Sequence, residues 1–342
     1  MRILGIETSC DETAAAVVVD GHLIESSVVS TQISLHAPFG GVVPEIAGRA
    51  HVERIIPVVR EALEQAGLDP SGVGVDAVAC TVGPGLIGAL LVGVSAAKAL
   101  AWSWDVPFRG VNHLEGHLAS PFMEVGSAAA PEMPLLTLLV SGGHTLLVLM
   151  RSPTSYEVLG STIDDAAGEA YDKVSRLLKL GYPGGPVIDR LAASGDPKAI
   201  AFPRAIRDRP HDFSFSGLKT AVANHVRLHP AVVGSDEAAD IAASFQEAVV
   251  DTLAEKTRAA GRRFGVRSIA IGGGVAANSS LRARITSMAA DEGWEAHIPE
   301  RVFCTDNAAM IAAAAWWWHT VDAPLALDCA ANPNLRLGRP GT

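Results

Sequence analysis

The sequence of 342 residues predicts an α/β fold in which a βββαβα module occurs twice, as two domains around a central cleft. Each half of the chain opens with short apolar strands separated by polar Gly or Ser turns. Each half then continues with a helix, a buried strand and another helix, and 33 glycines are available for the turns. We expect residues 1–112 and 306–342 to form the first domain, and residues 113–305 the second, with an insertion at 161–235.

Apolar runs and turn residues set the bounds of each element. In the first half, Gly21 separates two strands and Gly67 ends a long helix. The expected elements there are strands 2–8, 14–19 and 22–29, helix 44–67, strand 76–82, helix 87–102 and strand 107–111. In the second half they are strands 135–140, 144–150 and 156–160, helix 236–264, strand 268–271, helix 278–290, strand 294–298 and helix 306–318.

The composition is that of an ordinary water-soluble α/β protein, with 49% hydrophobic and 19% charged residues. The longest apolar run near the C-terminus, residues 308–318, is too short to cross a bilayer. Glu7 interrupts the first apolar run and no cleavage pattern follows, so no signal peptide is expected. Four cysteines without paired spacing fit a reducing cytoplasm. We expect a cytoplasmic protein that does not bind membranes.

The net charge of −10 argues against tight nucleic-acid binding by this chain unaided, because phosphate contacts need clustered basic residues. Two basic clusters stand out against this average. They consist of Arg204, Arg207, Arg209 and His211, and of Lys256, Arg258, Arg262, Arg263 and Arg267. A solvated helix or loop face is the ordinary explanation of both clusters.

Two histidines lie four residues apart in Asn112-His113-Leu114-Glu115-Gly116-His117, at the start of an expected helix. Residues at this spacing lie about 40° apart around a helix, so both imidazoles can reach one metal ion. Glu115 lies about 200° from His113 and points away. In the zinc-peptidase helix a glutamate follows the first histidine directly, whereas here that position is Leu114. The stretch predicts a metal site without the usual groups for peptide hydrolysis.

Asp306 is the candidate third ligand. An aspartate just before a helix ordinarily caps its N-terminus. In the duplicated module, however, this helix and the His113 helix both follow the fifth strand, so we expect them to face each other across the cleft. Two histidines and one aspartate leave open positions on an iron or zinc ion, which suits substrate binding.

Three polar loops are expected where strands end, which is where ligands collect in such folds. They are residues 8–13, 140–145 and 272–278. Glycines in the second loop expose backbone N–H groups that suit a phosphate. Glycines in the third allow a flat ligand such as adenine to lie against the backbone, and Asn278 begins a helix there.

The segment 163–173 carries four acidic residues. A helix with an acidic first turn accounts for most of them, but Asp172 comes too late for that explanation and is assigned to a ligand. The turn at residues 182–186 then brings Asp189 back toward the same region.

These motifs together resemble one known family, the bacterial TsaD-type tRNA threonylcarbamoyltransferases. The resemblance runs from residue 1 to about 337 and rests on residues 5–13, the His113/His117 pair, and residues 141–145, 164–172 and 272–278. The family has the actin/hexokinase/Hsp70-like ATPase superfold, in agreement with the duplicated module. Its acyltransferase activity moves a threonylcarbamoyl group from threonylcarbamoyl-adenylate to N6 of adenosine 37, in tRNAs that read codons beginning with A.

The resemblance also implies functional residues. The family's metal ligands correspond to His113, His117 and Asp306, holding one Fe²⁺ per subunit, with Zn²⁺ in some members. Its substrate-binding positions correspond to Leu139, Val140, Ser141, Gly142, Gly143, Asp172, Gly185, Asp189 and Asn278. The archaeal and eukaryotic branch has a tyrosine ligand where this chain has Leu139. This difference favours the bacterial branch and leaves the fourth metal position to substrate or water.

The expected reaction is attack of the adenine N6 amine on an activated acyl carbon, with AMP as the leaving group. A metal ion would bind the threonylcarbamoyl group or polarise its carbonyl, while Ser141-Gly142-Gly143 holds the phosphate and Asn278 the nucleoside. The attacking N6 must lose a proton, and Asp11 or Glu12 is the natural acceptor. Alternatively, either carboxylate could simply order the hairpin.

The resemblance implies partners as well: tRNA, an inactive TsaB-type paralogue that forms a heterodimer, and a small TsaE-type ATPase. We expect tRNA to meet a composite basic surface that includes Arg204, Arg207, Arg262 and Arg263. Three alternative functions fit the sequence less well. A metallopeptidase lacks a placed base, a sugar or carboxylate kinase of the same superfold does not explain the histidines, and a scaffold has no use for an intact ligand set.

Overall fold

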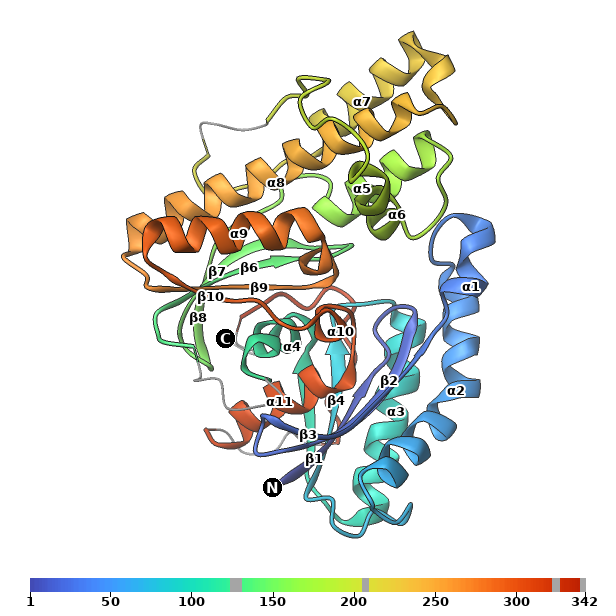
Figure 1. The fold of residues 1–342 in the computed structure, drawn as a ribbon. Helices are drawn as coiled ribbons and strands as arrows, with labels where there is room; N and C mark the ends of the chain where they lie inside the picture. The colour runs from blue at the N-terminus through green and yellow to red at the C-terminus, as the bar shows by residue number, and fades with distance from the viewer. Residues whose placement is uncertain (124–130, 205–208, 322–326, 339–342) are drawn as a thin grey trace. The chain divides into compact units, whose positions relative to one another are not determined.

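The computed structural model describes residues 1–123, 131–204, 209–321 and 327–338, and the chain divides into two compact units. The first comprises Met1–Ala130 and Thr305–Thr342, and the second comprises Pro131–Cys304. The boundary therefore follows residue 130 rather than residue 112, so that the histidine helix belongs to the first unit. Each unit is built on its own five-stranded sheet (Figure 1).

The first sheet has the strand order β3-β2-β1-β4-β5. Its strands are β1 (Arg2–Glu7), β2 (Glu12–Val19), β3 (Leu23–Thr31), β4 (Ala77–Gly83) and β5 (Phe108–Asn112). The first three strands form an antiparallel meander, while β4 and β5 run parallel to β1. Between the strands lie α1 (Ile33–His36), η1 (Ala37–Phe39), α2 (Pro44–Gln65) and α3 (Ile87–Trp104), and after β5 come α4 (His113–Ala119), η2 (Ser120–Phe122) and, from the C-terminal segment, α11 (Ala308–His319).

Helices cover the two faces of this sheet, and successive side chains of β1 point alternately to one face and the other. Leu4 and Ile6 point into the apolar core formed with α2 and α3. Gly5 points to the other face, where a Cβ would lie only 2.3 Å from the carbonyl oxygen of Ala308 in α11. Glycine at this position therefore permits the close approach of α11, which fixes the residues just before that helix relative to β1.

Helix α3 is the single described helix that is long and apolar enough to cross a membrane. Its Ala89, Leu90, Val94 and Ala97 side is buried in the core of the first unit. Packing against β4 and α2 accounts for the apolar residues on this side of the helix.

The second sheet repeats the topology of the first, with the order β10-β9-β6-β7-β8. Its strands are β6 (Leu135–Val140), β7 (Thr145–Ser152), β8 (Ser155–Ser161), β9 (Ser268–Gly272) and β10 (Glu295–His297). The antiparallel and parallel pairings recur in the same places, so the predicted duplication of the module is confirmed. The helical elements are α5 (Ala167–Leu177), α6 (Gly184–Ala192), α7 (Ser216–Leu228), η3 (Pro230–Val232), α8 (Glu237–Phe264), η4 (Gly274–Ala277), α9 (Ser279–Glu292) and α10 (Arg301–Cys304).

The final helix follows the fifth strand of the second module but packs in the first unit, against β1 and α4. The sequence suggested that this helix and the histidine helix would face each other from different domains. They are instead neighbours within one unit, because α4 belongs to the first unit, which the C-terminal segment also joins.

Candidate functional site

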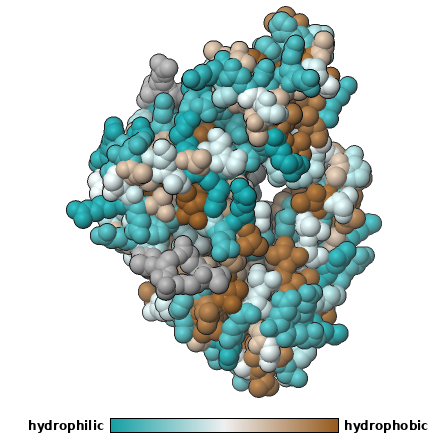
Figure 2. Space-filling view, in the orientation of Figure 1, coloured by the Kyte–Doolittle hydropathy of each residue, from teal (hydrophilic) through white to brown (hydrophobic). Residues whose placement is uncertain are grey.

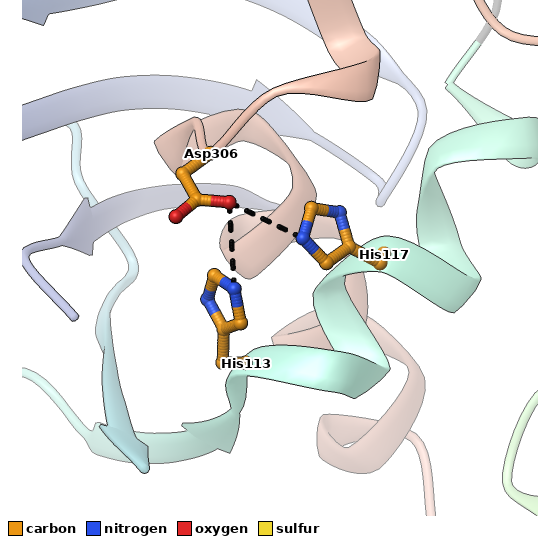
Figure 3. A group of neighbouring side chains, drawn as sticks. All are labelled: His113, His117 and Asp306. Carbon is orange, nitrogen blue, oxygen red and sulfur yellow. Dashed lines mark ion pairs between the residues drawn. The ribbon is translucent and has the colours of Figure 1, made fainter. Parts of the chain in front are cut away.

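The histidine pair is presented by the junction of β5 and α4. Asn112 ends the strand and caps the helix, its Oδ1 accepting a hydrogen bond of 2.9 Å from the backbone N–H of Leu114. His113 is thus the first residue of α4, and His117 follows one turn later on the same side. Figure 3 shows both imidazoles pointing toward Asp306. The Nε2 atoms of His113 and His117 lie 3.4 and 3.2 Å from Asp306 Oδ1.

Asp306 does not cap the final helix, contrary to its ordinary role. Asn307 takes that position, and its Oδ1 accepts a hydrogen bond of 3.0 Å from the backbone N–H of Met310. The Asp306 carboxylate is therefore left to face the two histidines. One ligand atom from each of the three residues lies within 4.8 Å of the others.

The surroundings of His117 fit a bound cation. Its side chain is fully buried, and within the described part of the chain neither ring nitrogen makes a hydrogen bond of good geometry. An unsatisfied buried imidazole is costly, and burial lowers its pKa, which leaves a neutral ring free to donate a lone pair. Two imidazoles and one carboxylate form a donor set used for iron and zinc.

Glu7 orients the other histidine. This fully buried carboxylate at the end of β1 lies 3.0 Å from His113 Nδ1, through its Oε2 atom. It also accepts hydrogen bonds from the hydroxyl of Thr81 and the backbone N–H of Ser9. A proton on Nδ1 of His113 directs Nε2 to Asp306, as second-layer carboxylates do for metal-binding histidines. This role was not predicted, and its signal in the sequence is an acidic residue that ends an apolar strand.

Charges within this group shift the pKa values in opposite directions. Burial lowers the pKa of His113, but the carboxylates of Asp306 and Glu7 outweigh it and hold the pKa well above its usual value. Burial raises the pKa of Asp306, but the two histidines outweigh this effect and hold it far below its usual value. Without a cation, His113 therefore carries a proton that a metal ion must displace.

Asp11 and Glu12 lie in the same unit, at the hairpin between β1 and β2. Asp11 is mostly buried, and its side chain is hydrogen-bonded to that of Glu12. Burial, the Asp306 carboxylate and Asp11 together raise the pKa of Glu12 to about 10. Without a cation, Glu12 is therefore protonated at neutral pH, and its expected role as a proton acceptor stays a prediction.

Glu115 points away from the histidines, as the helix geometry predicted. It is buried, and its Oε2 accepts a hydrogen bond of 3.1 Å from the indole Nε1–H of Trp318. This side chain joins α4 to α11 and is not placed to activate water at the His113/His117/Asp306 group.

The predicted substrate-binding residues all lie in the second unit. Leu139 and Val140 end β6 and are fully buried. Ser141-Gly142-Gly143 forms the turn into β7, and both glycines face open space. Two other backbone segments approach this turn closely: a Cβ on Gly273 would lie 2.5 Å from Val140 O, and one on Gly168 would lie 2.6 Å from Ser141 O.

Three predicted polar residues tie neighbouring helices together. Asp172 Oδ1 accepts a hydrogen bond of 2.7 Å from the backbone N–H of Gly184, next to Gly185, at the start of α6. Asp189 accepts bonds from Ser279 N–H (3.1 Å) and Oγ–H (2.8 Å) at the start of α9. Asn278 caps α9, its Oδ1 accepting from Leu281 N–H at 2.9 Å.

Sequence reasoning missed further members of this group. Asn278 Nδ2 donates a 2.7 Å hydrogen bond to Gln246 Oε1, which also lies 3.4 Å from the hydroxyl of Tyr171. An open pocket is lined by Asp189, Ala192, Ala193, Pro197, Ala243, Gln246, Glu247, Ser279 and Ser280. Gln246 lies inside the long α8, where helical periodicity does not distinguish a pocket-lining polar residue, so no sequence signal marks it.

Four of the predicted basic residues form ion pairs in the described part of the chain: Arg204, Arg209, Arg258 and Arg262. Arg204 donates through Nε and Nη2 to Asp251, and Arg262 makes a two-point contact with Glu292. Arg263 is exposed, and Arg207 lies outside the described residues. The expected basic surface is therefore reduced by neighbouring carboxylates.

Two copies of one mixed sheet and glycine turns at strand ends define a protein with the duplicated actin-like fold, and its His/His/Asp group could hold a metal ion. Solved structures with this fold include T. kodakarensis HypF (TM-score 0.60, 15% identity, 93% of this chain and 48% of that one). Another is component A of (R)-2-hydroxyglutaryl-CoA dehydratase from Acidaminococcus fermentans (TM-score 0.52, 15% identity, 94% and 99%). At this identity the likeness concerns the fold alone.

Sequence comparison identifies the family. The profile of TsaD, tRNA N6-adenosine threonylcarbamoyltransferase, matches residues 24–313. A protein of that description from Symbiobacterium thermophilum is 52% identical, over 98% of this chain and 97% of its own length. Another, from Anaeromyxobacter dehalogenans, is 56% identical over 91% of this chain and 92% of its own length. The chain therefore belongs to the TsaD family, and is a transferase that forms threonylcarbamoyladenosine in tRNA.

Proposed function

We propose that this chain transfers the threonylcarbamoyl group of threonylcarbamoyl-adenylate to N6 of adenosine 37, in tRNAs that read codons beginning with A. The His113/His117/Asp306 group is the observation that carries the proposal. It gives the transferase a site for one metal ion, in which a buried, unsatisfied imidazole meets a carboxylate freed from helix capping. We assign Fe²⁺ to this site, with Zn²⁺ as the alternative occupant.

The second unit supplies groups suited to the adenylate. Glycine backbone N–H groups in the Ser141–Gly143 turn suit its phosphate. The region formed by Asp172, Gly185, Asp189 and Asn278 suits its nucleoside, because carboxylate and amide oxygens accept hydrogen bonds from ribose hydroxyls and the adenine amine.

The first unit supplies groups suited to acyl transfer. A divalent cation bound by His113, His117 and Asp306 would polarise the acyl carbonyl and, by offsetting the Asp306 charge, lower the pKa of Glu12. The carboxyl pair Asp11/Glu12 then takes the proton released by N6 as the new C–N bond forms and AMP leaves. Glu7 keeps His113 in the tautomer that directs Nε2 toward Asp306.

An exposed apolar face on α2 and α3 supports an obligate protein partner. Val52 and Ile56 on α2 are 63% and 54% exposed, and Ile87 and Leu91 on α3 are 48% and 52% exposed. Each pair is four residues apart, so each helix presents one apolar stripe, and the two helices pack together. Apolar surface of the first unit is visible in Figure 2. We assign this face to a TsaB-type inactive paralogue, because exposed apolar surface of this kind marks protein contacts.

The remaining partners follow from the family resemblance. A TsaE-type ATPase completes the proposed assembly, and the reaction takes place in the cytoplasm, where tRNA is found. Since the chain is acidic overall, tRNA binding relies on a surface shared with partners, to which exposed Arg263 and Arg267 contribute from this chain.

The test is transfer by the purified chain with its partners, threonylcarbamoyl-adenylate and unmodified tRNA, followed by mass spectrometry of the digested tRNA. His113→Ala should abolish both bound metal and modification. His319→Ala, which changes an exposed histidine of the same unit, is the matched control and should leave both unchanged. Modification at the normal rate by His113→Ala would remove the metal site from the mechanism, and none by wild type with competent partners would refute the proposed function.

A further inference from the structure

A chain of buried polar side chains runs through the first unit to the loop that carries Asp11. The backbone N–H of Val43 donates to His36 Nδ1 (3.2 Å), and His36 Nε2 donates to Gln32 Oε1 (3.3 Å). Gln32 Nε2 donates to His51 Nδ1 (3.3 Å), and His51 Nε2 donates to the carbonyl oxygen of Cys10 (2.9 Å). His36, Gln32 and His51 are all buried.

The four hydrogen bonds share one direction, which fixes the protonation of both rings. Each imidazole accepts at Nδ1 and donates at Nε2, as a neutral ring does. Burial lowers the pKa of His51, in agreement with a neutral ring. The hydroxyl of Thr13, which is also buried, lies 2.8 Å from His51 Nδ1 and supports the same tautomer. His51 is therefore a fixed donor aimed at one backbone carbonyl.

That carbonyl lies between two parts of the proposed site. On one side of Cys10, Ser9 Oγ lies 3.2 Å from His113 Nδ1. On the other side is Asp11, whose carbonyl oxygen accepts a 2.9 Å hydrogen bond from the backbone N–H of Gln32. His51, through its side chain, and Gln32, through its backbone N–H, thus hold adjacent carbonyls of one short loop. Apolar residues would fill the same volume without the cost of burying polar groups.

We propose that His51 is a positioning residue for threonylcarbamoyl transfer: by holding the Cys10 carbonyl, it sets the place of the Asp11 and Glu12 carboxyls beside the His113/His117/Asp306 group. This inference rests on the proposed function and extends it to a residue on α2. A loop displaced by about 1 Å can slow a reaction by about 100-fold, because the reacting groups lose their alignment.

The test compares His51→Gln with His51→Asn, whose side chains differ in length. Glutamine can place a donor near the position of Nε2, whereas asparagine reaches only the Nδ1 position and leaves the Cys10 carbonyl unpaired. His297→Asn is the matched control, since His297 is a buried histidine on β10 of the second unit. Each variant is assayed with its partners for kcat, KM for the adenylate, bound metal and melting temperature.

We expect His51→Asn to lower kcat by about 10- to 100-fold, with KM and bound metal unchanged. His51→Gln should recover most of that loss, and His297→Asn should lower the melting temperature without changing kcat. If His51→Asn does not fold, the nearly isosteric Thr13→Val provides the test, because it removes only the hydroxyl that supports His51. It should lower kcat by about 3- to 10-fold.

Unchanged kcat in the folded variants would overturn the inference. So would equal loss in His51→Asn and His51→Gln, since that result indicates a requirement for the imidazole shape alone. Failure of wild type to modify tRNA is a separate result, because it refutes the proposed function before any variant is compared.

Discussion

The Glu12 carboxyl is held in its protonated form by its surroundings, and the substitution Glu12→Gln tests this directly. Burial, Asp306 and Asp11 raise its pKa from 4.5 to about 10. The unfolded chain releases this proton above pH 4.5, whereas the folded, cation-free protein retains it up to about pH 10. Because the folded state binds the extra proton, rising pH within this window favours unfolding. Glutamine cannot ionise and therefore removes that pH-dependent loss of stability.

The size of this stability loss follows from the pH range between the pKa of Glu12 in the unfolded chain and the pH of the experiment. Each pH unit is worth about 1.4 kcal/mol, so at pH 7 the Glu12 carboxyl lowers the free energy of unfolding by at most about 3 kcal/mol. The side chain is partly accessible to water, which reduces this value. We expect Glu12→Gln to stabilise the cation-free protein by about 1–2 kcal/mol at pH 7, or roughly 4 °C in melting temperature.

The assay is thermal unfolding in the presence of a chelator at pH 5, 7 and 8. The advantage of Glu12→Gln should grow with pH and shrink when a divalent cation is added, since the cation offsets the Asp306 charge. Glu53→Gln, at an exposed position on α2, should show neither trend. Transfer activity should fall in Glu12→Gln even though the protein is more stable. A stability difference that is the same at every pH would refute the electrostatic account of this site.

Three further outcomes are expected. At pH values below the raised pKa of His113, the affinity for Zn²⁺ should rise about tenfold per pH unit, because the ion displaces the proton on His113. Calorimetry in several buffers measures the number of protons released on binding. An affinity that does not change with pH would contradict this prediction. Asn307→Ala should cost about 1 kcal/mol of stability and weaken metal binding, because the α11 cap that frees Asp306 is lost; unchanged metal content at limiting Zn²⁺ would argue against this link. Arg263→Glu should weaken tRNA binding and reduce by about 1 the slope of log affinity against log salt concentration. Arg204→Glu should mainly lower the melting temperature, because it breaks the contact with Asp251. The reverse pattern would contradict the ion-pair assignment.

Features that depend on local sequence could be predicted well. Apolar alternation and glycine turns gave both five-stranded modules, because strand periodicity and turn chemistry act over a few residues. The position of the histidines was also predictable, since Asn112 is a strong capping residue directly before His113. The direction of Glu115 followed from helix geometry alone.

Features that depend on contacts distant in sequence could not be derived in this way. Asp306 and Asn307 are both good capping residues, and only the packing of α11 decides that the second one caps the helix. Glu7 reaches His113 across 106 positions of the sequence. Likewise, the pairing of Arg204 with Asp251 spans 47 positions, so the sequence does not show that this arginine of the basic cluster is neutralised in the fold.

The place of Asp306 in the chain has a consequence for biosynthesis. His113 and His117 emerge from the ribosome long before the residue that completes their ligand set, and the whole second unit is made in between. A nascent or truncated chain therefore offers two imidazoles without the carboxylate, and α4 lacks α11 as a packing partner. A complete ligand set for a metal ion therefore exists only after the second unit and Asp306 have been synthesised.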